Sequence, residues 1–174
     1  KPRAHVLRVV DDFINRHFSG RPVLGVHVRQ TDAASGFENR ISVSADAFLE
    51  EAASWISVNP SGFVFLATDD ERVVDNFKRR LGNIVLYRDC IRSVDERSLH
   101  GHYDSAVAGS AYEKGLDVIV DALLLSRCDC LIRSHSRVTC YSLCVSSNLK
   151  FIDLDLKNGQ LRTPWLHSHN PLLQ

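Results

Sequence analysis

The sequence lacks several features that mark common classes of protein. Its 21 basic and 21 acidic residues balance, so its charge gives no indication of a nucleic-acid or membrane-surface role. No apolar run approaches the roughly 20 residues that a membrane-spanning helix needs. No glycine-rich loop of the GxGxxG or GxxxxGK type is present, which disfavours a generic dinucleotide or P-loop site. An anionic ligand would therefore be held by side chains and helix amino termini.

Methionine is absent, and cysteine occurs five times. Because the chain opens with Lys1-Pro2-Arg3 and has no initiator residue, we expect it to be excised from a longer protein. An odd number of cysteines rules out a fully paired intrachain set, and we expect most of them to be buried apolar side chains. The cysteines leave the cellular compartment open.

The residues that are present predict one α/β domain. The chain has 174 residues, of which 44% are hydrophobic, enough to bury a core. Apolar runs typical of buried strands alternate with helical periodicity throughout. We expect a first strand that begins at Val23 and includes His27 and Arg29, and further strands near 62–67, 83–87, 130–133 and 150–153, with helices between them. This alternation predicts a Rossmann-like, doubly wound and mostly parallel sheet that makes residues 1–174 a single domain.

The first candidate site follows the strand that begins at Val23. His27 and Arg29 lie two residues apart, so both side chains point to one face of the sheet, and Thr31 and Asp32 follow directly. Open α/β sheets bind ligands at this end of their strands. The guanidinium of Arg29 suits a phosphate, and His27 can donate to a phosphate oxygen or hold Asp32. The alternative is a structural Arg–Asp pair.

Two further candidate sites contain acidic residues. Asp69 and Asp70 follow the strand expected at 62–67, and Asp121 interrupts an apolar helix. Asp69 could orient His27 or Arg29 from the adjacent strand, whereas Asp70 could simply cap the next helix. Asp121 lies in an otherwise apolar helical stretch, where a carboxylate needs a partner. That partner is either an arginine such as Arg133 or a base with two adjacent N–H donors, as guanine has.

A phosphate-binding helix start is expected in the last part of the domain. Ser136 heads a predicted helix, and its hydroxyl and the free backbone amides suit a phosphate. The segment 88–112 is rich in Ser, Asp, Gly and His, and loops of that length are commonly functional.

These motifs, in this order, resemble the GDP-fucose-dependent fucosyltransferases of the α1,6, nodulation and protein O-fucosyltransferase type. The matching pieces are Gly25-Val26-His27-Val28-Arg29-Gln30-Thr31-Asp32, Phe65-Leu66-Ala67-Thr68-Asp69-Asp70, and the block from Asp121-Ala122-Leu123-Leu124-Leu125-Ser126-Arg127-Cys128-Asp129 through Ser136. The resemblance implies a domain like the C-terminal half of a GT-B-type glycosyltransferase.

The resemblance also implies a reaction and its participants. It implies an inverting, metal-independent transfer of L-fucose from GDP-fucose to a glycan, glycoprotein or other hydroxyl acceptor, with no cofactor and no bound metal. The acceptor-binding lobe of such enzymes has no counterpart in these residues, so we expect the isolated domain to be inactive. The implied compartment is the Golgi or ER lumen for a eukaryotic protein and the cytoplasm for a bacterial one.

The resemblance assigns roles to residues. It places Arg29 at the β-phosphate with His27 beside it, and Asp69 in support. It makes Asp121 the reader of the guanine edge. Ser136 and Arg137 would hold phosphate or ribose.

The sequence departs from the family pattern near the first motif. The α1,6 enzymes carry a second arginine where this chain has Gln30, and a lysine where it has Ala33. Glu38 is the nearest candidate for the catalytic base, after a shift of one residue. These departures motivate an alternative, a non-catalytic GDP-sugar-binding module with a degenerate active site.

A third hypothesis comes from another class of enzyme. A metal-dependent phosphoesterase could use strand-end carboxylates such as Asp32, Asp69 and Asp70 together with His100 and His102. No ordered ligand spacing supports such a site.

Overall fold

The centre of the molecule is a five-stranded, fully parallel sheet. The computed structural model describes residues 2–18, 20–29, 43–93 and 111–157. The strands are β1 (Val23–Val28), β2 (Phe63–Thr68), β3 (Val85–Leu86), β4 (Cys130–Arg133) and β5 (Lys150–Asp153), arranged in the order β3-β2-β1-β4-β5. The predicted α/β class and the parallel sheet are confirmed.

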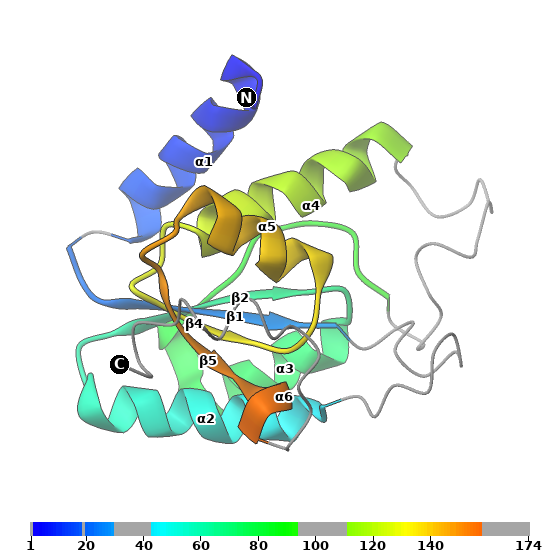
Figure 1. Ribbon diagram of the computed structural model, residues 1–174. Coiled ribbons are helices and arrows are strands. Elements are labelled where there is room, and N and C mark those ends of the chain that lie inside the picture. Colours follow the sequence, from blue (N-terminus) through cyan, green and yellow to red (C-terminus); the bar gives the residue numbers. More distant parts are fainter. Residues whose placement is uncertain (1, 19, 30–42, 94–110, 158–174) are drawn as a thin grey trace.

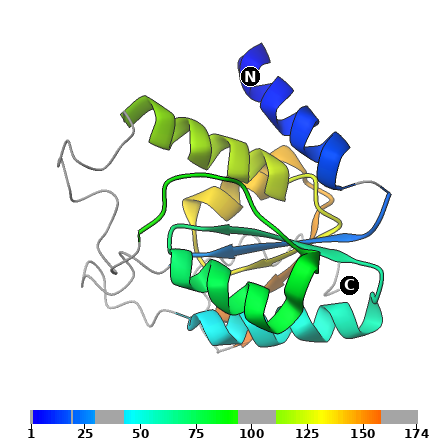
Figure 2. The same cartoon turned by 180° about the vertical axis from the view of Figure 1, so that it is seen from behind.

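Helices cover both faces of this sheet. One face carries α1 (Ala4–His17), α4 (Ala111–Leu125) and α5 (Arg137–Val145), and the other carries α2 (Ala45–Val58) and α3 (Glu71–Leu81) (Figure 1). The view from behind shows the same three layers (Figure 2). Two short helices, η1 (Gly82–Ile84) and α6 (Leu154–Lys157), flank β3 and β5. The doubly wound arrangement expected from the sequence is therefore present.

Strand β1 is the middle strand of the sheet, because it pairs with β2 on one side and with β4 on the other. All six of its residues are buried, which fits its continuous apolar sequence. Alternate residues serve the two cores: Val23 belongs to the core under α1, α4 and α5, whereas Leu24 and Val26 belong to the core over α2 and α3. Gly25 and His27 share the side of Val23, so His27 faces the layer that holds α4 and α5.

Two expectations about local structure are wrong. The third strand is shorter than 83–87, because Gly82 takes a φ of 70° and the chain coils through η1 before it reaches Val85. Most cysteines are not buried: Cys128 and Cys130 are, but Cys90 and Cys140 are half-buried and Cys144 is exposed. Of the two on α5, Cys140 packs against the edge of the core and Cys144 faces solvent.

The direction of winding reverses between β1 and β4. From β1 the chain steps outward to β2 and β3, then returns to β4 on the other side of β1 and continues to β5. In open α/β sheets this reversal leaves a crevice at the carboxyl ends of the two strands, and ligands bind there. His27 lies near the end of β1, and Ser136 follows β4, so two of the predicted site residues flank this point.

Candidate functional site

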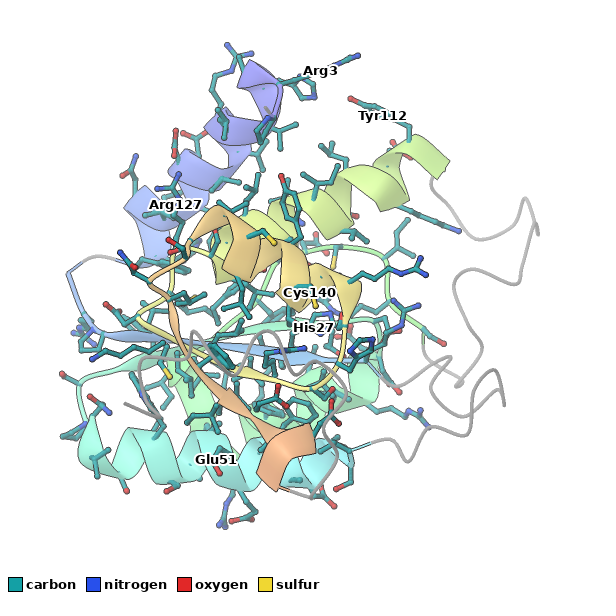
Figure 3. All side chains as sticks on the ribbon, viewed as in Figure 1. Arg3, His27, Glu51, Tyr112, Arg127 and Cys140 are labelled. Atoms are coloured by element: carbon teal, nitrogen blue, oxygen red, sulfur yellow. The ribbon has the colours of Figure 1, made fainter. Side chains whose placement is uncertain are left out.

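His27 is buried at the carboxyl end of β1 (Figure 3). Burial lowers the pKa of His27 to about 4, an effect opposed by the charge of Asp69 and reinforced by Arg29 and Arg133. Its Nδ1 atom is buried without a hydrogen-bond partner among the residues that the structure describes. Burial therefore favours the neutral ring at pH 7, and Nδ1 is not exposed to solvent.

Arg29 and Asp69 lie at the same sheet edge as His27. The register pairs His27 with Ala67 and Val28 with Thr68, so Asp69 is opposite Arg29 just beyond the last paired residues. Both charges act on the His27 ring. The predicted grouping of His27, Arg29 and Asp69 is thus present, whereas Thr31, Asp32 and Glu38 lie outside the described residues.

Asp70 serves as a helix cap. Its Oδ1 accepts a hydrogen bond of 2.9 Å from the backbone N–H of Arg72, and the Arg72 guanidinium binds both of its oxygens. The pKa of Asp70 is lowered chiefly by the hydrogen bond from Arg72. The structural role expected for Asp70 is confirmed, and the carboxylate has its partners within α3.

Asp121 forms an ion pair with Arg88, and not with Arg133 as the sequence suggested. Arg88, which follows β3, places Nη1 3.1 Å from Asp121 Oδ1 and Nη2 2.7 Å from Asp117 Oδ1. The second oxygen of Asp121, Oδ2, has no hydrogen-bond partner among the described residues, and 16% of the side chain is exposed. Burial raises the pKa of Asp121 to about 6, although Arg88 and Arg92 act to lower it.

Arg133 is not the partner of Asp121. Its guanidinium pairs with Asp153 at 3.0 Å, and both side chains are almost completely buried. The reason is the sheet itself, because β4 and β5 pair Arg133 directly with Asp153 at their carboxyl ends. This ion pair ties together the two strands that precede the Ser136 turn and α6.

Ser136 begins α5 as expected. Its Oγ accepts a 3.2 Å hydrogen bond from the N–H of Val138, so the hydroxyl proton is left to donate elsewhere. Asp155 holds the turn before it by accepting a hydrogen bond from the N–H of His135. Arg137 is exposed on the first turn of the helix. A phosphate at this helix start would meet backbone amides, a hydroxyl and a guanidinium.

Asp121 and His27 lie over the same region of the sheet. Leu125, near the end of α4, is close enough to Gly25 that a Cβ added there would lie 3.1 Å from Leu125 Cδ2. Asp121 is one helical turn earlier, about 6 Å back along α4, and His27 is two residues later, about 7 Å along β1. Because α4 runs opposite to the strands, both displacements point toward the carboxyl edge.

The assembled site is suited to a nucleoside diphosphate and is poor in metal ligands. His27 and Arg29 lie at the carboxyl end of β1, the start of α5 follows β4, and Asp121 lies on α4 above the same face, with one carboxylate oxygen that has no partner among the described residues. Within the described ranges, no group of three or more His, Cys, Asp or Glu side chains could hold a metal ion. In the same ranges, no helix is long and apolar enough to cross a membrane.

Sequence reasoning missed Arg88 and Asp155. Arg88 lay in a segment treated as a loop, although Asp117 and Asp121 are spaced four apart and could have indicated a shared cation. Asp155 acts through a backbone amide, and nothing in its sequence context indicates that contact.

The sequence matches one protein family over most of its length. A family model described as nodulation protein Z (NodZ) matches residues 1–163. Nodulation protein Z of Sinorhizobium fredii is 26% identical in an alignment of 140 residues that covers 76% of this chain and 42% of that protein.

Solved structures share the fold. A crystal structure of NodZ α-1,6-fucosyltransferase soaked with GDP-fucose superposes with a TM-score of 0.56 at 23% identity, covering 91% of this chain and 47% of that one. Fucosyltransferase NodZ from Bradyrhizobium gives a TM-score of 0.56 at 23% identity, covering 88% and 45%. NodZ co-crystallised with GDP gives 0.52 at 24% identity, covering 80% and 41%. The chain spans less than half the length of these relatives.

Proposed function

This chain belongs to the nodulation protein Z (NodZ) family, and from that membership we propose that it is the GDP-fucose-binding part of a fucosyltransferase. The proposed reaction transfers L-fucose, with inversion and without a metal, to a hydroxyl of a glycan or glycoprotein. NodZ structures have been obtained after soaking with GDP-fucose and by co-crystallisation with GDP, which supports this donor.

The observation that carries the proposal is the Asp121 carboxylate. Oδ1 is held by Arg88, and Oδ2 has no hydrogen-bond partner among the described residues. A carboxylate has about four acceptor positions, so Arg88 leaves room for two more donors. Guanine presents two adjacent N–H groups, which adenine lacks, and a carboxylate can accept both. Asp121 would therefore select the base.

The remaining residues would bind the diphosphate. Arg29 would contact the β-phosphate, with neutral His27 beside it, and Ser136 and Arg137 would hold phosphate or ribose. Asp69 would keep Arg29 and His27 in place at the sheet edge. Donors aimed at the departing diphosphate stabilise the charge that grows on it in the transition state.

Transfer itself would be a single displacement. The acceptor oxygen attacks C1 of fucose, the bond from C1 to the β-phosphate oxygen breaks, and its electron pair leaves with GDP. The acceptor proton passes to a general base, for which Glu38 is the candidate. General-base assistance is typically worth about 10²–10⁴ in rate.

The test is calorimetric titration of this chain with GDP, ADP and UDP, first in EDTA and then with Mg²⁺. We expect binding that is selective for GDP, indifferent to Mg²⁺ and lost in Asp121→Ala and Arg29→Ala. The control is Arg80→Gln, which removes a positive charge from an exposed pair with Glu50 on the other face of the sheet. Equal binding of the three nucleotides, or binding only with Mg²⁺, would overturn the proposal.

Fucosyl transfer is tested separately, on a protein of the full length of the NodZ relatives that contains this chain. We expect GDP release from GDP-fucose that depends on an acceptor, and an α-linked product by NMR from the β-linked donor. GDP-selective binding without any turnover would instead favour the non-catalytic module. The departures at Gln30 and Ala33 motivate that alternative, which the match to the NodZ family does not favour.

A further inference from the structure

We propose that Arg88 is a positioning residue for the donor, which holds Asp121 so that its open carboxylate edge can read guanine. Arg88 does not contact the nucleotide in this proposal and acts only through Asp121. The inference rests on the proposed function, because Asp121 reads guanine only if the chain binds a guanine nucleotide.

The first step is the geometry of the guanidinium. Arg88 Nη1 donates to Asp121 Oδ1 and to the backbone oxygen of Asp117, both at 3.1 Å, and Nη2 donates to Asp117 Oδ1 at 2.7 Å. Three acceptors on one turn of α4 are thus bound by one rigid fork, which a lysine ammonium cannot match. The Arg88 side chain is only 12% exposed, so this contact is largely shielded from water.

The second step is the attachment of Arg88 itself. Arg92 donates to the backbone oxygen of Arg88 at 2.5 Å and reaches Glu71 Oε2 at 3.4 Å. Arg92 also lies over the Tyr87 ring, 5.4 Å from its centroid. Ser93 exchanges backbone hydrogen bonds with Asp69 and Glu71. The strap of residues 87–93 therefore links α4 to the β2–α3 turn at the ligand-binding edge.

The third step is charge. Burial raises the pKa of Asp121 to about 6, with the charge of Asp117 adding to that rise and those of Arg88 and Arg92 opposing it. The Cys90 thiol is close to both carboxylates, but its own pKa is raised to about 11, chiefly by burial, so it stays neutral. Loss of a cation at this distance typically raises a carboxyl pKa by about 1–3 units. A protonated Asp121 could no longer accept two N–H donors.

The experiment measures the affinity of this chain for GDP-fucose between pH 5.5 and 8.5. GDP-fucose is the better probe than GDP because its diphosphate is esterified at both ends and has no ionisation near pH 6. His27, with its pKa of about 4, also stays neutral over this range. The variants are Arg88→Gln, Arg88→Lys, Asp117→Asn and Asp121→Asn, with Arg80→Gln as the matched control and thermal unfolding as the check on folding.

We expect Arg88→Gln to lower affinity about tenfold at pH 7 and to recover most of it by pH 8.5. Its pH midpoint should move upward, whereas Asp117→Asn, which removes a repelling charge but keeps an acceptor for Arg88, should move the midpoint downward. Arg88→Lys should keep the wild-type midpoint with weaker binding at every pH. Asp121→Asn should bind weakly without pH dependence, and Arg80→Gln should match the wild type.

The outcomes separate this inference from the proposed function. Midpoint shifts of opposite sign support it, because general damage to the fold cannot produce them. Wild-type binding that is lost in Asp121→Asn but has the same affinity and midpoint in Arg88→Gln overturns the role of Arg88 alone. If Arg88→Gln does not fold, Arg88→Lys and Asp117→Asn decide, and an unchanged midpoint in Asp117→Asn overturns the inference. No binding by the folded wild type overturns both proposals.

Discussion

His27 and Asp121, the two buried titratable groups of the site, respond to pH in opposite directions. Burial lowers the pKa of His27 to about 4 and raises that of Asp121 to about 6, because it penalises the charged form of each. The shift of His27 therefore lowers stability at acidic pH, whereas the shift of Asp121 lowers stability at neutral and higher pH. Such displaced pKa values are common at functional sites.

The first prediction concerns the stability contributed by neutral His27. The unfolded chain binds more protons than the folded one between pH 4 and 6.5, so stability falls as the pH falls through this window. The shift corresponds to about 3 kcal/mol at 1.36 kcal/mol per unit. We expect urea unfolding to show that wild type loses about this much more stability than His27→Gln between pH 7 and pH 4.

Asp121 acts in the opposite sense in part of that range, so the comparison must be with His27→Gln rather than with wild type alone. Its raised pKa makes the folded chain bind more protons between pH 3.8 and about 6, and stability there falls as pH rises. Equal pH slopes for wild type and His27→Gln would show that His27 is not buried as the structure describes.

At the scale of residues, the sequence predicted that Asp121 needs a partner, but it did not predict which residue that partner is. An isolated acid within Val118–Leu125 had to be paired, and it is. The identity of the partner depended on which strand lies opposite α4 and on the path of residues 87–93, and neither is encoded near Asp121. Arg133, the cation considered from sequence, pairs instead with Asp153, because the register of β4 and β5 places these two residues side by side.

At the scale of elements, α4 can lie close to β1 because Gly25 has no side chain. A Cβ on Gly25 would lie 3.1 Å from Cys128 Sγ and 3.1 Å from Leu125 Cδ2. These contacts are tighter than well-packed neighbours allow, and β1 is fixed on both sides by β2 and β4. A larger residue at position 25 therefore requires the Leu125 and Cys128 side chains to shift by a few tenths of an ångström.

We predict that Gly25→Ala costs about 1–3 kcal/mol of folding stability, as overpacking usually does. Because the crowding involves Cys128, the double variant Gly25→Ala/Cys128→Ala should be more stable than the sum of the single changes implies. Chemical denaturation of all four proteins measures this coupling. Gly115→Ala is the control, since nothing lies within 4 Å of a Cβ there and α4 should gain up to about 1 kcal/mol.

The start of α3 gives a second prediction at this scale. Asp70 is buried and caps α3 through the N–H of Arg72. We expect Asp70→Ala to cost about 1–2 kcal/mol and Asp70→Asn to cost less, because asparagine also caps helices well. GDP affinity should be unchanged in both folded variants. A selective loss of nucleotide binding in Asp70→Asn would contradict this assignment of Asp70 to the helix alone.

Most elements were predictable because each carries its own pattern. Strands β1, β2 and β4 are apolar runs, and Ser44, Asp70 and Ser136 cap the helices that follow them. Strand β3 was overestimated because Gly82 admits a left-handed turn that apolar residues alone do not reveal. The sheet order depended on contacts between elements far apart in the chain, and periodicity does not specify them.

At the scale of the whole molecule, the candidate site draws residues from the ends of the three inner strands, β2, β1 and β4, and from α4. His27 and Arg29 come from β1 and its end, Asp69 follows β2, Ser136 follows β4, and Asp121 comes from the helix packed above. A ligand bridging these groups would connect both halves of the doubly wound sheet across the reversal between β1 and β4. Ligand binding should therefore raise the free energy of global unfolding, and its effect should not be limited to the ordering of one loop.

The last prediction tests this coupling. A ligand that binds only the folded chain adds about 2.7 kcal/mol at a concentration of 100 times Kd. For a protein of this size that corresponds to a rise in Tm of about 5–10 °C. We expect this rise with GDP, measured by calorimetry in EDTA, and none with ADP. Asp121→Ala should abolish the rise while the protein still unfolds cooperatively. An equal rise with both nucleotides would mean that the molecule recognises the diphosphate alone and that Asp121 does not read the base.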